Sequence, residues 1–260
     1  MEAIVQRLRP VVDRHGSAQH RVRFYQSQLQ LNLRRDRYVT TEETLAYAHA
    51  AVAVCEEYGV IEGLPMARFN LGFVLLWQDS FEEAMVELRA ALELAERAGD
   101  IAHCARCLSY LTLAARRLGR VEETAKYAEQ SARAAHAGDM RDYVAAAHAH
   151  RSWVALKTGV IDAARTHAEA AVSIWSDLAL AFPMQWIATL TLLYLDLKED
   201  AVDRALERVD TLLAHTQQPL PGDAMDALAR AARFRDAREP SSARSALATA
   251  LRHLESSGYL

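Results

Sequence analysis

Four glycines in the middle of this chain recur at a nearly constant interval along the sequence. Gly99 and Gly138 are each followed by Asp and lie 39 residues apart, and Gly119 and Gly159 lie 40 residues apart. A self-similar period near 40 residues, seen in independent markers, indicates a repeat architecture in which each repeat is one supersecondary unit. The segments that occupy the same place in three successive units are 80–83 (SFEE), 120–123 (RVEE) and 160–163 (VIDA).

The composition indicates that the repeated unit is helical. Only 6 Pro and 10 Gly occur in 260 residues, and alanine is abundant, which favours helix throughout. Runs of β-branched residues with a period of two are missing, so no strand is predicted. Hydrophobic residues make up 51% of the chain, enough to build a sizeable core. The sequence therefore predicts an all-α fold.

The stretch from 70 to 95 (NLGFVLLWQDSFEEAMVELRAALELA) is the clearest single unit. It is predicted to form two helices that meet at a turn, with the small residues Gly72 and Ala84 letting them approach closely. One such unit cannot bury its apolar face alone, so neighbours are expected on both sides. The leucines expected to fill the seam are Leu71, Leu75 and Leu88.

This order and spacing resembles the tetratricopeptide repeat (TPR), a helix-turn-helix unit of 34 residues or a little more. The resemblance covers about residues 17–256 and implies one continuous domain, a right-handed α-solenoid (superhelix) of about six TPR-like helix hairpins. Residues 1–16 fit no repeat and are interpreted as an N-terminal helix or cap, or as the tail of an upstream domain. The expected repeats are 17–59, 62–99, 100–138, 139–180, 182–215 and 224–256.

The long period, the Gly-Asp ends and the alanine-rich second helices indicate one branch of this family. They are similar to the regulatory TPR regions of MalT-like regulators and of bacterial ATPases with linked nucleotide-cyclase domains. Thr112 and Ser152 stand where Gly72 does in the clearest unit, and Arg151 stands where Leu71 does. The resemblance implies the regulatory or scaffold part of a bacterial signalling protein.

Charge and composition limit the partners and the compartment. A net charge of −4 and a pI near 6.2 argue against a nucleic-acid binder. Residues 1–38 nevertheless hold eight Arg against three acidic residues, a net +5, which could meet an acidic partner or form a solvated helix face. No apolar run is long enough to span a membrane, and residues 1–16 lack the apolar core of a secretory signal. Three cysteines, an odd count, indicate reduced thiols and a cytoplasmic setting.

Motifs for catalysis are missing from the sequence. The patterns GxxxxGK[ST], GxGxxG and GxSxG do not occur, so no enzyme activity and no cofactor are predicted. His103, Cys104 and Cys107 form the most metal-like cluster, because Cys104 and Cys107 lie one helical turn apart. A closed zinc site needs four ligands and no second pair follows. We interpret these thiols as helix-packing residues, with metal and redox roles as alternatives, and predict no metal site.

The candidate binding residues lie on the first helices of the repeats, which line the inner groove in the resembled family. Aromatic rings beside cations suit a peptide or an acidic, partly apolar ligand. The alternative is that the rings belong to the core between repeats and that the cations are solvated. Matching the register from Leu71 gives Phe69, Phe73, Trp77, Arg106, Arg116, Arg117, Trp153, Lys157, Trp186 and Tyr194.

Three functions remain open from the sequence. The favoured one is a non-enzymatic TPR-type module whose groove binds a protein or peptide segment. The second is a regulatory domain that senses a small molecule in the groove and changes its superhelical pitch. The third is an enzyme. Self-association as a homodimer is also an expectation, while the partner, the oligomeric state and the parent protein are not specified by the sequence.

Overall fold

The computed structural model describes residues 2–260 and is helical throughout those residues, with no strand. The predicted all-α class is therefore confirmed. The α-helices, with one short 3-10 helix between the third and fourth, are α1 (Glu2–His15), α2 (Ala18–Arg35), α3 (Glu42–Glu57), η1 (Ile61–Gly63), α4 (Leu64–Leu76), α5 (Phe81–Ala98), α6 (Ile101–Arg117), α7 (Val121–Ala137), α8 (Arg141–Lys157), α9 (Ile161–Ser176), α10 (Trp186–Lys198), α11 (Val202–Leu213), α12 (Gly222–Asp236) and α13 (Pro240–Ser256).

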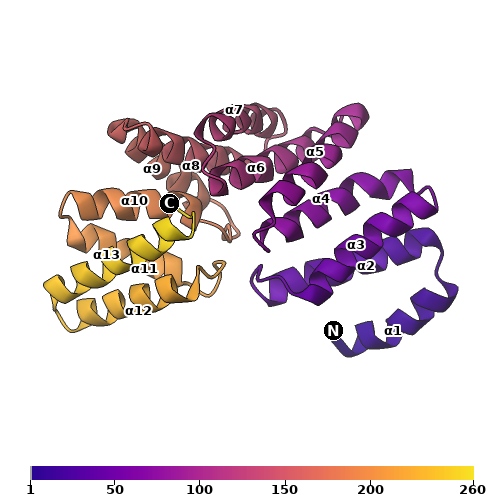
Figure 1. Ribbon diagram of the computed structural model, residues 1–260, viewed down its shortest axis with the longest axis horizontal. Helices are drawn as coiled ribbons and strands as arrows, with labels where there is room; N and C mark the ends of the chain where they lie inside the picture. Colours follow the sequence, from indigo (N-terminus) through magenta and orange to yellow (C-terminus); the bar gives the residue numbers. More distant parts are fainter. Residues whose placement is uncertain (1) are drawn as a thin grey trace. The chain divides into compact units, whose positions relative to one another are not determined.

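Helices that follow one another along the chain pack as hairpins (Figure 1). The most extensive contacts join α8 with α9, α12 with α13, α4 with α5 and α2 with α3. Stacked hairpins of this kind make up an α-solenoid, so the predicted fold class is confirmed. The chain forms two compact units, one ending at Ala114 and the other spanning Ala115–Leu260, and the boundary falls within α6.

The inner turn of every hairpin contains a residue with a left-handed backbone at an equivalent position, and the first turn also contains Arg37, at φ 49°. The equivalent residues follow one another at intervals of 38 to 41 positions, which is the physical basis of the repeat period. Only two of the six are glycine, so the glycine spacing in the sequence revealed a third of a regular series. The six residues, with φ from 57° to 78°, are Tyr38, Asp79, Gly119, Gly159, Asp200 and Arg238.

Close approach of α4 and α5 depends on Gly72, as predicted. A Cβ added at this position would lie 2.7 Å from Leu88 Cγ and 3.0 Å from the carbonyl oxygen of Ala84. Thr112 occupies the matching position one repeat later and is fully buried. Its hydroxyl donates to the carbonyl of Leu108 at 2.7 Å, which satisfies the polar group inside the packed helix.

Side-chain hydroxyls cap two of the helices. The hydroxyls of Ser17 and Thr41 accept hydrogen bonds from the backbone N–H groups of His20 and Thr44. Ser80 precedes α5 in the same way, but its side chain accepts no bond from that helix in the described structure. The backbone of Ser80 has ψ 59°, outside the extended region that aims a cap side chain at the helix.

The loop between α11 and α12 is packed by two buried glutamines. Gln217 Nε2 donates to the carbonyl of Phe182 at 2.9 Å, and Gln218 Oε1 accepts the indole N–H of Trp186 at 3.0 Å. Both glutamines lie in this loop, because α11 ends at Leu213 and α12 begins at Gly222. The contact fixes the start of α10 and the orientation of Trp186.

A fully buried carboxylate joins three helices of the second unit. Asp196 of α10 lies 2.8 Å from Arg165 of α9, and 3.6 and 3.4 Å from Arg204 and Arg208 of α11. Buried carboxylates are retained when charge-assisted hydrogen bonds compensate for lost hydration. Asp196 therefore fixes α10 between its neighbours in the chain.

Candidate functional site

The candidates in the first unit form an aromatic cluster around α4. The ring centroids of Phe73 lie 6.1 Å from Phe69, 5.7 Å from Trp77 and 4.7 Å from Tyr110 of α6. Phe69 and Phe73 are buried, and Trp77 is half-buried. The rings of Phe69 and Phe73 are stacked, whereas Trp77 and Tyr110 meet Phe73 edge to face, and both kinds of pair stabilise helix packing. Arg106 lies partly exposed on α6.

The second unit brings five candidates together in one place. The cation–aromatic cluster, as we call it, lies where α6 ends and where α8 and α10 meet it. Arg116 stands between two indoles, with its guanidinium carbon 5.5 Å from the ring centre of Trp153 and 5.6 Å from that of Trp186. Arg116 is only 1% exposed, and the two Trp are 2% exposed each. The cluster consists of Arg116, Arg117, Trp153, Lys157 and Trp186.

The buried guanidinium of Arg116 stays positively charged. Burial lowers the pKa of Arg116 to about 9, and the charge of Arg117 contributes to the lowering. That pKa is still above neutral pH, and Arg116 donates to the carbonyl of Ile187 at 2.8 Å. Burial, and then the charge of Arg116, lower the pKa of the enclosed His150 well below its usual value, so this imidazole is neutral.

The chain that follows α13 crosses this cluster. Gly258 ends α13 with a left-handed backbone of φ 74°, and the N–H of Tyr259 returns to the carbonyl of Leu254 at 2.8 Å. With the bond from Gly258 N–H to Glu255, this is a Schellman motif, which turns the chain sharply at a helix end. The turn directs residues 257–260 onto the cations.

Residues 257–260, which we call the capping segment, are bound through their main chain. Each of the three cations donates to one main-chain oxygen of the segment, and charged donors make such bonds stronger than neutral ones. These bonds are Arg117 to Ser257 (3.3 Å), Arg116 to Tyr259 (3.1 Å) and Lys157 to Leu260 (3.1 Å).

The side chains of the capping segment add specific contacts. The Tyr259 ring lies 3.9 Å from the guanidinium carbon of Arg117 and 4.8 Å from the ring centroid of Trp186. Leu260 is buried, whereas Tyr259 is half-buried. An added Cβ at Gly258 would lie 3.2 Å from the carbonyl oxygen of Arg117, so the segment approaches α6 closely.

A cavity of about 370 Å³ adjoins the capping segment. The indole N–H of Trp153 and the Nε–H of Arg116 find no hydrogen-bond acceptor among residues 2–260, although both are buried there. Donors without acceptors remain available to groups that enter the site. The residues that line the cavity are Arg116, Arg117, Leu118, Gly119, Val121, Trp153, Lys157, Glu255, Gly258 and Leu260.

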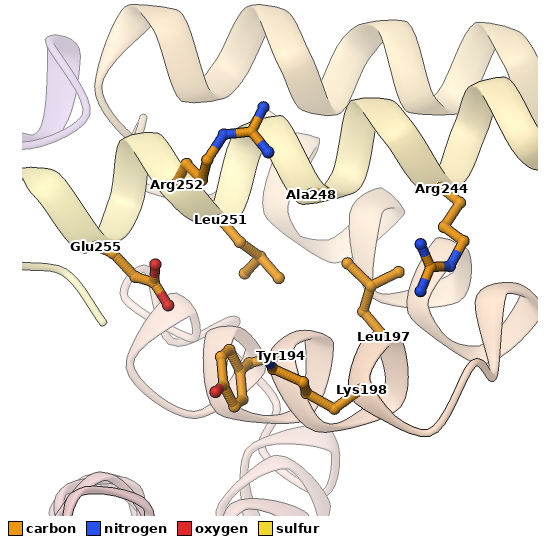
Figure 2. Close-up of a pocket in the computed structure, with 8 residues that line it drawn as sticks. All are labelled: Tyr194, Leu197, Lys198, Arg244, Ala248, Leu251, Arg252 and Glu255. Carbon is orange, nitrogen blue, oxygen red and sulfur yellow. The ribbon is translucent and has the colours of Figure 1, made fainter.

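Tyr194 lies in a separate hollow between α10 and α13, shown in Figure 2. This hollow has a volume of about 240 Å³. Lys198 Nζ lies 5.3 Å from the Tyr194 ring centre, and Arg244 pairs with Asp200 at 2.9 Å. Tyr194 therefore contributes to a second cationic and aromatic surface, and Glu255 lines both this hollow and the cavity beside the capping segment.

The cysteine pair on α6 lies in an apolar environment. Cys107 is fully buried. Burial raises the pKa of the Cys107 thiol and the pKa of the Cys104 thiol. A raised pKa disfavours the thiolate, which is the form that binds metals and attacks disulfides. Within residues 2–260, no group of three or more His, Cys, Asp or Glu side chains is placed to hold a metal ion.

Comparisons with known proteins define the fold. No family model and no curated protein matches the chain. The crystal structure of the apo form of RapI matches with a TM-score of 0.61 and 12% identity, over 98% of this chain and 69% of that one. BtubC from P. vanneervenii matches with a TM-score of 0.53 and 17% identity, over 88% of this chain and 91% of that one.

The chain has the fold of a helical-repeat protein. At 12% and 17% identity, the similarity to the two solved structures concerns the fold alone. The TPR family and its MalT-like branch remain predictions. In the described part of the chain, no helix combines the length and apolar character needed to cross a membrane.

The sequence named all five residues of the cluster among its ten groove candidates, but it did not predict that they meet or that the capping segment contacts them. The last predicted repeat ended at 256, and the four residues after it carry no helical periodicity. One local signal was present. Gly258 followed by Tyr259 and Leu260 places an apolar pair directly after a helix-ending glycine, and residues at such positions commonly pack back onto the structure.

Proposed function

We propose that this chain is a non-enzymatic binding module for a peptide or protein segment, acting as the regulatory or scaffold part of a bacterial signalling protein in the cytoplasm. A TPR-type array is the proposed family. One observation carries the proposal: the cation–aromatic cluster holds the capping segment by its main-chain oxygens. A surface that binds four residues of its own chain in this way has the chemistry to bind a peptide.

The arrangement of donors explains why a peptide is the favoured ligand class. Every peptide offers main-chain carbonyls, so three cations that each bind one carbonyl recognise the main chain of a peptide rather than one side chain. Trp186 and Arg117 then select an aromatic side chain between them. Rigid aromatic and Arg residues are also the types that contribute most to binding energy at interfaces.

Peptide selection against the full-length chain tests this proposal. We expect displayed random peptides to be enriched, and fluorescein-labelled copies of them to bind in an anisotropy titration. Arg117→Ala and Lys157→Ala should each weaken binding about 10-fold, because a hydrogen bond to a charged group contributes about 1.5–3 kcal/mol. Arg133→Ala removes an exposed cation on α7 and is the matched control, with unchanged affinity expected.

Two results would contradict the proposal. Selected peptides that bind both cluster variants as tightly as the unmodified chain would place the peptide elsewhere. Enrichment of no peptide, together with thermal stabilisation by a member of a metabolite panel, would instead identify a small-molecule sensor.

A further inference from the structure

We infer that the capping segment is an intramolecular ligand of the cation–aromatic cluster, and that a partner peptide with an aromatic residue followed by an aliphatic one must displace it. This inference rests on the proposed function and deepens it. It names the side-chain pattern of the ligand and states that the free chain occupies its own site.

The first argument is that the last hairpin has its own core without the capping segment. Leu247, Ala250 and Leu254 of α13 are fully buried, and α13 packs extensively on α12. The segment itself is fastened mainly by hydrogen bonds from cations and by ring stacking, with Leu260 as its one buried side chain. Release of the segment therefore exchanges polar contacts for water and leaves the α12–α13 core in place.

The second argument is that the segment has a pivot and an open side. Gly258 provides the pivot, because its left-handed backbone ends α13 and turns the chain toward the cluster. Tyr259 is half-buried and so reachable from solvent. The cavity of about 370 Å³ lies directly beside Gly258 and Leu260, which gives an incoming peptide a place to begin displacement.

The third argument is that the occupant defines the ligand. Tyr259 places a ring between the guanidinium of Arg117 and the indole of Trp186, and Leu260 buries an aliphatic side chain. Arg116 and Lys157 bind main-chain oxygens, so these two bonds do not depend on the side chains of the ligand. The favoured partner is thus a peptide with an aromatic residue and then a leucine-like residue.

Self-occupancy has a measurable cost for the partner. The apparent dissociation constant of a ligand equals its intrinsic value divided by the fraction of molecules whose site is open. A segment tethered beside its site competes at an effective concentration on the order of millimolar. If the site is open in about one molecule in ten, a partner binds about 10-fold more weakly than it would to a permanently open site.

The test uses a fluorescein-labelled, amidated peptide with the sequence of residues 254–260 (LESSGYL). Its binding to the full-length chain and to the Tyr259→Ala variant is measured by fluorescence anisotropy. We expect the variant to bind up to about 10-fold more tightly, because it has lost the ring that occupies the site. Tyr259→Phe keeps the ring and should bind as the unmodified chain does. Tyr58→Ala, at an exposed ring that directly follows α3, should change nothing.

A double variant locates the peptide. Arg117→Ala added to Tyr259→Ala should remove the gain in affinity, because the labelled peptide then loses the guanidinium that contacts its tyrosine. Equal affinity of the unmodified chain and Tyr259→Ala, or binding to neither of them, overturns the inference. If peptides from the display experiment still require Arg117 and Lys157, the proposed function stands while self-occupancy is wrong.

Discussion

At the scale of single residues, the helix contacts depend on the absence or presence of a few atoms. Gly72 has no side chain where α4 crosses α5, and a Cβ there would meet Leu88 and the backbone of Ala84. The partly buried pair of His148 and His167 shows a different case, in which the surroundings disfavour the charged form of a side chain. Both situations predict large responses to small chemical changes.

Gly72→Ala should destabilise the chain by about 1–3 kcal/mol, the usual cost of inserting a methyl group into a packed interface. The backbone of Ala84 cannot move aside without shifting α5. Gly222→Ala at the start of α12 is the matched control, because a Cβ there meets nothing within 4 Å and the substitution should be neutral or slightly stabilising. Urea unfolding monitored by circular dichroism compares the two, and equal stability of both variants would contradict the packing argument.

The pair of His148 and His167 should make the stability depend on pH. Their Nδ1 atoms lie 3.1 Å apart, a contact that requires one ring to accept and therefore to be neutral. Desolvation lowers the pKa of both. The charges of His167, Arg151 and His136 lower the pKa of His148 further, and Arg151 lowers the pKa of His167 while Glu129 raises it.

Because both pKa values fall on folding, the unfolded chain binds more protons than the folded chain just below pH 6.5. The free energy of unfolding should therefore decrease as the pH falls through this window. His167→Gln should make that decrease shallower, and His49→Gln, at an exposed position of α3, should not. Urea unfolding at pH 7.5, 6.5 and 5.5 measures both slopes, and identical slopes for the two variants would exclude the pair as the cause.

At the scale of helices and turns, the repeats are set by backbone conformation more than by particular side chains. The left-handed position in the inner turn is filled by Tyr, Asp, Gly or Arg in different repeats. Asp and Gly adopt this conformation readily, whereas a residue such as Arg238 adopts it at a cost of about 1–2 kcal/mol. Some turns therefore hold strain that others do not.

Arg238→Gly should stabilise the last hairpin by about 1 kcal/mol. Glycine removes the strain of the left-handed backbone, and the greater conformational entropy of glycine in the unfolded chain offsets part of this gain. Gly159→Ala makes the opposite change at the equivalent turn of an earlier repeat. It should cost about 1 kcal/mol, with no contribution from packing since nothing lies within 4 Å. Thermal melting of the two variants should shift in opposite directions, and shifts of the same sign would refute this account.

Asp196 gives a further prediction about how helices are joined. Asp196→Asn removes the charge shared by Arg165, Arg204 and Arg208 and should destabilise the chain by about 1.5–3 kcal/mol, the range for hydrogen bonds to charged groups. Glu199→Gln alters an exposed carboxylate on two of the same arginines and should cost much less. Chemical unfolding distinguishes them, and comparable losses would show that burial of Asp196 is not decisive.

At the scale of the whole molecule, the sequence predicted the fold well and the site in part. Local patterns carry the fold, because glycine spacing, small residues such as Gly72 and the lack of strand patterns all report on neighbouring residues. Five of the ten candidate residues meet in the cation–aromatic cluster, because equivalent positions on successive first helices lie near one another in a stack.

The rest of the site depends on contacts between distant parts of the chain. Arg116 binds the carbonyl of Tyr259 across 143 residues, and Lys157 reaches Leu260 across 103. No periodic pattern connects such pairs, and the capping segment lies outside the repeats. Asp196 was missed for a related reason, since a single acid on an apolar helix gives no sign of the three arginines that neighbouring helices supply.

The regular series of left-handed turns has a consequence for the history of this chain. Each turn closes one hairpin and resets the direction of the next, so the distance from one turn to the following one is a natural module of gain or loss. Duplication or deletion of about 40 residues keeps the alternation of first and second helices, because it begins and ends at equivalent turns. A change of about 20 residues would instead place two first helices, or two second helices, next to each other in the chain. Proteins that descend from the same ancestor should therefore differ in length by whole hairpins of two helices.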